Sequence, residues 1–356
     1  MIAATYLANP VICLPALRLA DLSGLPAKDL LKGLGLDAQL KQQLLSFDEL
    51  QAGFKFAFDL YLSVDQQIQF LENSQQSFSD PAASFVIGAA ASFSDLGILG
   101  LTMLSAPTIR QAIQIGGLYS HIGGTLNSMY CEECDDKIAY IVEPPEVDPA
   151  LQRYIIEEQF ASFQIYLQEL QEQTTAIKQP CVAGVKFSYS KPDYFFRYEE
   201  LFNCPIEFDC ARNEFWIEPG LLALPARYAN HEAFGVCSRQ CQSALDTLKE
   251  KDQLVRTLKQ YIAAQDATFP KLEDSAKEFG YNSRALRRKL ESLNCSFSSL
   301  VTEVKTEQAQ LLLQKPDLSI SEISELLGYT EVTNFRRAYR SWTGKSPSGY
   351  RRGLSL

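Results

Sequence analysis

Apolar residues recur at helical spacing near the C-terminal end of the chain, in two neighbouring stretches. Residues 319–327 and residues 331–342 each carry apolar side chains three or four positions apart, which is the spacing of one face of an α-helix. Gly328 lies between them, and glycine commonly ends helices because it adopts a positive φ at little cost. The pattern predicts two short helices joined by a turn, with a shared apolar core made of Ile320, Ile323, Leu327, Phe335, Tyr339 and Trp342.

The same unit occurs a second time upstream, in residues 269–294. A short amphipathic stretch is followed by Gly280, by a polar cap at Asn282 or Ser283, and by further apolar residues at helical spacing. The inward positions of this copy are Leu272, Ala276, Phe279, Leu286, Leu290 and Leu293. Between the copies, residues 296–314 predict a helix long enough to hold the two units in a fixed orientation.

Cationic, hydrogen-bonding and small apolar residues occupy the other faces of the second helix of each unit. They are Val332, Thr333, Asn334, Arg336, Arg337 and Arg340 downstream, and Ser283, Arg284, Arg287 and Arg288 upstream. A rigid helix of this composition suits the major groove of DNA, where arginine can pair with guanine, asparagine with adenine, and a methyl group can touch thymine. Arginine-rich helix faces are also common on proteins that do not bind DNA, so the repetition of the unit is what favours two helix-turn-helix motifs.

The two units resemble the helix-turn-helix motifs of the AraC/XylS family of bacterial transcription regulators. The likeness is strongest in GYTEVTNFRRAYRSWTGKSPSGYRR, which matches the family's glycine-aromatic turn, its recognition helix and its closing G-x-S-P-x-x-Y-R. The resemblance implies that the polar positions named above contact bases or phosphates, together with Arg351 and Arg352. The chain departs from the family pattern at Gly349 and in the crowding of arginines on the first recognition helix, which favours phosphate contact there.

Charge is distributed unevenly along the chain. The whole chain has 33 Lys and Arg against 43 Asp and Glu, and a net charge of −10 would ordinarily disfavour nucleic acid as a partner. Residues 268–356 carry 14 Lys and Arg against 10 Asp and Glu, so the acidic excess belongs entirely to the remainder. This asymmetry removes the objection to DNA binding. It predicts that electrostatics contribute modestly to the affinity for DNA, and that specific contacts or dimerisation contribute the remainder.

The remainder of the chain predicts an α+β domain. Helical patterns dominate its first part and strand patterns follow. Helices are expected over a glycine-joined pair at residues 25–45, over 46–61, 65–78 and 149–173, and from about Thr108, with strands over 124–132, 137–143, 182–189 and 205–217. The length of 356 residues suits two domains. We expect an α+β effector-binding and dimerisation domain in residues 1–235, a connector helix in 236–267, and an all-α domain with two helix-turn-helix motifs in 268–356.

The connector carries a seven-residue apolar spacing. Leu248, Val255 and Ile262 could form the seam of a short coiled coil. Asp252 and Lys259 interrupt that seam, so packing within one chain is an equally good interpretation.

The N-terminal part more loosely resembles the effector-recognition domain of the ornithine-utilisation-regulator branch of the same family. Residues 99–112 and 198–225 carry this likeness. It implies that the domain binds a small effector, dimerises, and changes how the DNA-binding part is presented. The branch suggests an amino acid, whereas the many aromatic and aliphatic residues equally suit a fatty acid or another amphipathic molecule, and the pocket residues stay open. A carboxylate could be held by Arg18, Lys28, Lys32 or Lys186.

Cofactor and metal signals are weak. Cys131 and Cys134 form a C-x-x-C, and Cys237 and Cys241 lie one helical turn apart, so a zinc or redox site is conceivable. Acidic neighbours of the first pair disfavour a reactive thiolate, and an odd count of nine cysteines is typical of a reducing compartment. A GLGLDA sequence at residues 33–38 has no strand before it, so we expect no dinucleotide, other cofactor or metal.

Membrane, export and enzyme classes are disfavoured by the sequence. The opening residues lack a basic region typical of a signal peptide, and the most apolar region, residues 82–109, is interrupted by Asp95. There is no nucleophile elbow or phosphate-binding loop, and only two histidines are present. We therefore expect a cytoplasmic protein that is not an enzyme.

The leading hypothesis is a sequence-specific DNA-binding transcription regulator, an activator in its expected mode, controlled by a small molecule in the N-terminal domain. Its expected partners are promoter DNA, the effector, RNA polymerase and a second copy of the chain. The alternative is a small-molecule-binding or protein-interaction protein whose C-terminal helices dock a protein partner.

Overall fold

The chain folds into two compact units in the computed structural model, residues 1–249 and 250–356. The structure describes residues 7–8, 13–34, 62–134, 137–172, 180–222, 224–226, 228–265, 269–291, 293 and 295–354. The division between the units falls within the long helix α12 (His231–Ala263), which begins before the connector expected at residues 236–267.

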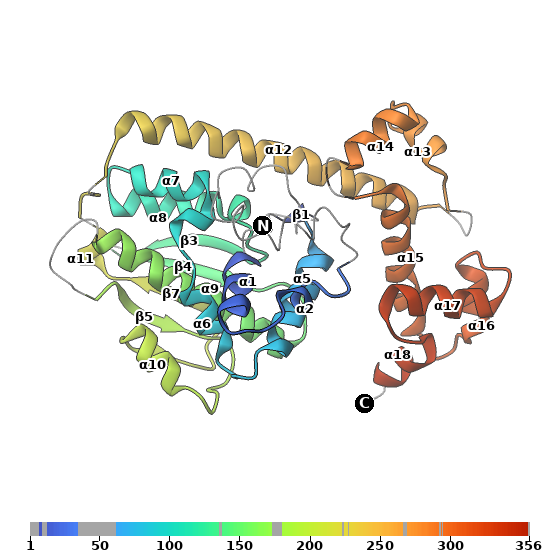
Figure 1. Ribbon diagram of the computed structural model, residues 1–356, viewed down its shortest axis with the longest axis horizontal. Helices are drawn as coiled ribbons and strands as arrows, with labels where there is room; N and C mark the ends of the chain where they lie inside the picture. The colour runs from blue at the N-terminus through green and yellow to red at the C-terminus, as the bar shows by residue number, and fades with distance from the viewer. Residues whose placement is uncertain are drawn as a thin grey trace. The chain divides into compact units, whose positions relative to one another are not determined.

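The first unit combines helices with a mixed sheet, which confirms the predicted α+β class (Figure 1). Its helices are α1 (Cys13–Leu22), α2 (Ala27–Leu30), α5 (Val64–Ser77), α6 (Ala83–Ala89), η2 (Phe93–Leu96), α7 (Ile98–Ser105), α8 (Ile109–Leu118), η3 (Ser120–Gly123), α9 (Pro149–Glu172), α10 (Phe196–Phe202) and α11 (Pro219–Leu222). Its strands are β1 (Leu7–Ala8), β2 (Leu62–Ser63), β3 (Ser128–Cys134), β4 (Lys137–Glu143), β5 (Val182–Lys186), β6 (Ile206–Glu207) and β7 (Asn213–Ile217). The helix predicted over residues 46–61, and residues 35–45 of the predicted helix pair, lie outside the described residues.

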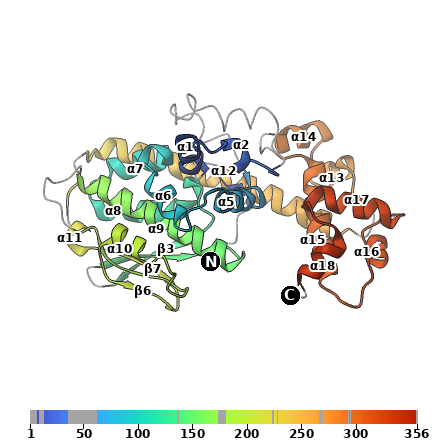
Figure 2. The same ribbon diagram turned by 60° about the horizontal axis from the view of Figure 1, so that its bottom comes forward.

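The main sheet has the strand order β3-β4-β7-β5-β6, in which only β5 and β6 are parallel. Tyr140 and Phe215 are opposite each other on neighbouring strands and face α9, where Phe163 packs against both rings. Figure 2 shows the strands as one layer with α8 and α9 lying over it. On the other face, Arg212 pairs with Glu132 and Glu214. One face of the sheet is therefore apolar and covered by helices, and the other is partly charged.

Helices α6 and α9 approach each other very closely. A methyl group at Gly88 of α6 would lie 2.3 Å from the backbone oxygen of Glu158 on α9, so only glycine permits this approach. Helix α9 is consequently buried on two sides, by α6 and by the sheet. This double burial places acidic residues of α9 inside the unit.

The most apolar region of the sequence, residues 82–109, forms the short elements α6, η2 and α7 and the start of α8. Thr108 then caps α8 by accepting a hydrogen bond from the backbone of Gln111, as expected for a helix beginning there. No helix in the described ranges is both long and apolar enough to cross a bilayer.

The second unit is helical and contains the two predicted repeats. Besides the end of α12, it comprises α13 (Leu272–Glu278), α14 (Ser283–Glu291), α15 (Phe297–Leu313), α16 (Ile320–Leu326), α17 (Val332–Thr343) and α18 (Pro347–Leu354). Figure 1 shows α15 running from the α13–α14 pair to the α16–α17 pair. The helix expected between the repeats is thus confirmed, whereas the apolar pattern assigned no element to the segment that forms α18.

The turns inside both repeats have the predicted glycine geometry. Gly280 and Gly328 have φ angles of 71° and 76°, in the left-handed region that favours glycine. In the second repeat, the Ser319 hydroxyl accepts from the backbone of Glu322, whose carboxylate accepts from the backbone of Ser319. This reciprocal cap satisfies two otherwise unpaired donors and fixes where α16 begins.

The end of α12 packs within the chain. Val255 and Ile262, two of the heptad positions, are buried. Lys259 is buried beside them, and its ammonium lies 2.7 Å from Glu307 and 3.3 Å from Glu303 on α15. The residue that interrupts the coiled-coil seam therefore pairs with the chain's own α15, in agreement with the interpretation of packing within one chain.

Candidate nucleic-acid interface and ligand pocket

Helix α17 is oriented by aromatic side chains on one face. Phe335 and Tyr339 have no exposed surface and pack with Ile323, Leu327 and Leu313. An α-helix has about 3.6 residues per turn. Burying Phe335 and Tyr339 on one face therefore directs the residues between them to solvent. The exposed residues are Thr333, Asn334, Arg336, Arg337 and Arg340, while Val332 is half-buried.

The arginines of α17 have no intramolecular partner among the described residues. The side chains of Arg336, Arg337 and Arg340 form no ion pair or hydrogen bond there. At the start of the helix, the Thr333 hydroxyl donates to the Glu331 carboxylate across 3.3 Å. Glu331 was not among the candidate residues, although a carboxylate at this position can accept a hydrogen bond from cytosine.

Helix α14 repeats this arrangement in the first helix-turn-helix unit. Leu286 and Leu290 are buried, and Arg284, Arg287 and Arg288 are exposed, again without an ion pair in the described part of the chain. The cap is Asn282, whose side-chain oxygen accepts from the backbone of Ala285 at 2.7 Å. Ser283 is half-buried as the first residue of the helix.

The closing arginines have different surroundings. Arg351 is half-buried, and its guanidinium donates to the backbone oxygens of Leu313 at 3.1 Å and Lys315 at 3.4 Å. Leu313 is the last residue of α15, where helix carbonyls lack intrahelical partners and attract cations, and Lys315 follows just after the helix. Arg352 is exposed. Arg351 thus holds α18 against α15, a role that the sequence motif did not indicate.

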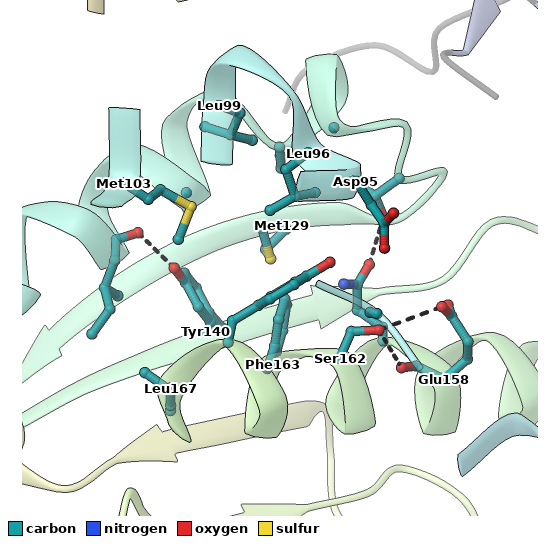
Figure 3. Close-up of a pocket in the computed structure, with 18 of the residues that line it drawn as sticks. Asp95, Leu96, Leu99, Met103, Met129, Tyr140, Glu158, Ser162, Phe163 and Leu167 are labelled. Atoms are coloured by element: carbon teal, nitrogen blue, oxygen red, sulfur yellow. Dashed lines mark hydrogen bonds between the residues drawn. The ribbon is translucent and has the colours of Figure 1, made fainter. Parts of the chain in front are cut away.

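A pocket lies inside the first unit, between α9, the sheet and the layer formed by η2, α7 and α8 (Figure 3). The pocket has a cavity volume of about 80 Å³, which is room for several water molecules. Figure 3 shows Met103, Tyr140 and Leu167 toward one end and Asp95, Ser162 and Glu158 toward the other. The apolar lining residues are Pro15, Ala91, Leu96, Leu99, Met103, Ile113, Met129, Phe163, Leu167 and Leu170. The pocket is therefore apolar over most of its length with a polar end.

Asp95 at the polar end is already neutralised. The Arg18 guanidinium donates to both of its carboxylate oxygens, at 2.5 and 2.6 Å, and also to the backbone oxygen of Ala90. Hydrogen bonding to Asp95 raises the pKa of Arg18 above its usual value. Arg18 itself is not a lining residue.

Glu158 at the same end has no such partner. Its side chain is buried, and burial raises the pKa of its carboxyl to about 7. The Ser162 hydroxyl lies 3.5 Å from one carboxylate oxygen, but it is closer to the backbone oxygen of Glu158 at 3.0 Å. In the described part of the chain, Glu158 forms no ion pair and receives no other hydrogen bond.

Its neighbour Glu157 shows how the chain satisfies a buried carboxylate elsewhere. Glu157 accepts hydrogen bonds from Ser84 at 2.5 Å, from Tyr194 at 2.9 Å and from Tyr198, and lies 3.9 Å from Arg153. Burial still raises the pKa of Glu157. The two adjacent glutamates therefore differ in surroundings, because only Glu158 lines the pocket.

None of the four cations considered for a carboxylate ligand lines the pocket. Arg18 is paired with Asp95, Lys186 lies 3.7 Å from Glu214 on the sheet, and Lys28 and Lys32 are exposed. The sequence did not single out Glu158. The available signal was a second apolar face on the helix, since Leu151, Tyr154 and Ile155 lie on the same side as Glu158, opposite Phe163 and Leu167.

The cysteines are all free. Burial raises the pKa of Cys131 to about 12, and Cys241 is buried, forming a contact with the Thr102 hydroxyl. Within the described ranges, no group of three or more His, Cys, Asp or Glu side chains is placed to hold a metal ion.

Comparisons with known proteins match both units. Residues 56–226 match the family model of the arabinose-binding N-terminal domain of AraC transcription regulators, and residues 275–353 match that of a helix-turn-helix domain. The first match contains most pocket residues, and the second contains α14 and α17.

Several curated proteins are similar along most of their length. The chain is 29% identical to the ornithine utilization regulator of Pseudomonas aeruginosa over 303 residues, which cover 81% of this chain and 86% of that protein. It is 23% identical to the transcriptional regulator VirS of Mycobacterium tuberculosis over 331 residues, or 91% and 93%. Among solved structures, the transcriptional regulator CdpR of Pseudomonas aeruginosa aligns with a TM-score of 0.43 and 18% identity, over 95% of this chain and 96% of that one.

Proposed function

Because the chain belongs to the AraC family of transcription regulators, we propose that α14 and α17 are its two recognition helices and enter successive major grooves on one face of a DNA duplex. The chain is a DNA-binding regulator with a ligand-binding N-terminal domain, as its relatives are. The observation that supports the assignment of the helices is their division into two faces. Each has a fully buried apolar face and an exposed face of arginines without partners in the described part of the chain.

Helix α17 supplies most of the base recognition in this proposal. Asn334, Arg336 and Arg337 can present amide and guanidinium groups to base edges, and Val332 and Thr333 supply methyl groups. Helix α14, with three arginines and few other hydrogen-bonding groups, mainly contacts phosphates through Arg284, Arg287 and Arg288. Arg340 and Arg352 also contact phosphates, while Arg351 supports α18 and acts on DNA only through it.

The base-reading role of Arg337 can be tested with substituted duplexes. We expect Arg337→Ala to weaken binding by about 1–3 kcal/mol and to relax preference at one base pair. Arg352→Ala is the matched control, because loss of a phosphate contact weakens binding to all sequences alike. Affinities for a panel of duplexes with single base-pair changes measure both. Equal losses on every duplex for Arg337→Ala would refute its role as a base reader.

The pocket of the first unit is the proposed effector site. An effector can shift the regulator only if it binds one conformational state more tightly than another.

We place the protein in the cytoplasm, acting as a dimer that contacts RNA polymerase at the promoter, with no catalytic role. The similar ornithine utilization regulator is named after an amino acid, which makes small nitrogenous metabolites the first class to test. Promoter footprinting with and without metabolite extract tests this control, and an unchanged footprint with every extract fraction would contradict it.

A further inference from the structure

We propose that the pocket binds an amphipathic cation, in which a protonated amine pairs with Glu158 and an apolar body fills the space toward Met103 and Leu167. This inference rests on the proposed function, since it names the chemical class of the effector. It does not depend on which DNA sequence the regulator recognises.

The charges around the pocket support a cationic ligand. Its lining contains two carboxylates, from Asp95 and Glu158, and no lysine or arginine from the described residues. Arg18 balances Asp95 with two hydrogen bonds, so one carboxylate is left without a counter-charge. The nearest arginine on the same helix, Arg153, lies beside Glu157 instead. A ligand carboxylate would therefore meet an unbalanced negative charge, and a ligand ammonium would meet a partner.

The hydrogen-bond capacity of Glu158 leads to the same conclusion. An ionised carboxylate can accept about four hydrogen bonds. The single proton of the Ser162 hydroxyl is shared among this carboxylate at 3.5 Å and two closer backbone oxygens, those of Glu158 and Gly88. A buried charge with so few donors is costly. An ammonium group brings three donors and the opposite charge to that position.

The groups that surround Glu158 do not provide the missing charge. Cys13, Tyr154 and Tyr166 interact with it electrostatically, and each is neutral or negative in its two protonation states. Tyr154 also shares a hydrogen bond with Ser74. Tyr166 lines the pocket and packs at a tilt against the ring of Phe93. None of these three side chains can therefore supply a positive charge to Glu158.

The apolar end selects the rest of the ligand. Met103, Met129 and Leu167 present thioether and aliphatic surface, and the Tyr140 hydroxyl is occupied by donating to the backbone oxygen of Ile113. Methionine side chains adapt to ligands of varied shape. Ligand carbon atoms gain stability there by leaving water, at about 0.8 kcal/mol for each buried methylene. A diamine of similar length would instead place a second charge among these apolar side chains, which is costly.

The test uses the full-length protein and three matched probes: octylamine, octanoate and octanol. Calorimetric titration at pH 7.5 measures binding, and duplex binding of the same preparation is measured in parallel. We expect octylamine to bind at least tenfold more tightly than octanoate or octanol. Octanoate binding as tightly as octylamine would overturn the proposal.

Two variants separate the pocket from general charge effects. Glu158→Gln keeps the shape of the side chain. It should lower the affinity for octylamine at least tenfold and leave the affinity for octanol unchanged. Glu143→Gln, at an exposed position at the end of β4, is the control and should bind octylamine like the unaltered protein. Unaltered octylamine affinity in Glu158→Gln would overturn the inference. If DNA binding persists in that case, the regulator assignment stands and only the ligand class fails.

Discussion

Replacing Glu158 by glutamine should change how the stability of the first unit depends on pH. Burial raises the pKa of this carboxyl from 4.5 to about 7, so the folded protein binds its proton more tightly than the unfolded chain does. The stability that this proton contributes is fully present below about pH 4.5 and is lost as the pH rises toward 7. Glutamine has no proton to lose, so Glu158→Gln should escape that loss.

The expected magnitude follows from the difference between the two pKa values. One pKa unit corresponds to about 1.4 kcal/mol, so the raised value corresponds to a loss of about 3 kcal/mol above pH 7. We expect Glu158→Gln and the unaltered protein to differ little in stability near pH 4. Above pH 7 the variant should be more stable by about 3 kcal/mol. Other buried acids, such as Glu157, titrate in both proteins and cancel in the difference.

The assay is urea unfolding followed by tryptophan fluorescence at several pH values. The chain has two tryptophans, Trp216 in the first unit and Trp342 in the second. A Trp342→Phe background makes the signal report the first unit alone. Glu143→Gln in that background controls for loss of a surface carboxylate. Parallel stability curves for Glu158→Gln and the unaltered protein would refute the burial of an unpaired carboxylate.

Three further outcomes follow from the packing of both units. Phe335→Ala removes a fully buried ring and should destabilise the second unit by about 3–5 kcal/mol in urea unfolding; a change below 1 kcal/mol would contradict its role in holding α17. Arg351→Ala should cost about 1–3 kcal/mol in the same assay because the backbone oxygen of Leu313 loses its side-chain donor, as does that of Lys315 just after α15. Arg352→Ala should leave stability nearly unchanged, and equal effects of the two would be inconsistent with this contact. Burial raises the pKa of Cys131 to about 12, so iodoacetamide should alkylate it at pH 8 much more slowly than the exposed Cys134. Mass spectrometry measures both rates, and equal rates would contradict the burial of Cys131.

The helices of the second unit could be predicted because their stability comes from local periodicity. Phe335 and Tyr339 are one helical turn apart, and Gly328 marks the only break between the helices, so spacing alone identified the buried face. The same spacing placed Trp342 in the core, but near the end of α17 it remains half-buried. Local pattern thus specifies the elements and leaves their ends less certain.

The pocket could not be predicted because it depends on contacts between distant segments. The backbone of Glu158 packs against Gly88, which comes from a helix many residues earlier, and Asp95 pairs with Arg18 from α1. A helix with a single buried face would leave such an acidic residue exposed to solvent. The role of Arg351 was missed for a similar reason, since its backbone acceptors lie at the end of α15 and just after it, far away along the chain. When a side chain contacts residues that are distant in the sequence, its partners can be identified only from the three-dimensional structure.

The central claim, that both arginine-bearing helices bind one duplex together, is tested most directly by the salt dependence of duplex affinity. Each phosphate contact contributes about 0.9 to the slope of log affinity against log salt concentration. Replacing the three arginines of α14 with alanine should reduce the slope by about 2 to 3, and replacing those of α17 should reduce both the slope and the sequence preference. An unaltered slope after either set of replacements would mean that the helix concerned does not touch the DNA, and the account of two recognition helices would be wrong.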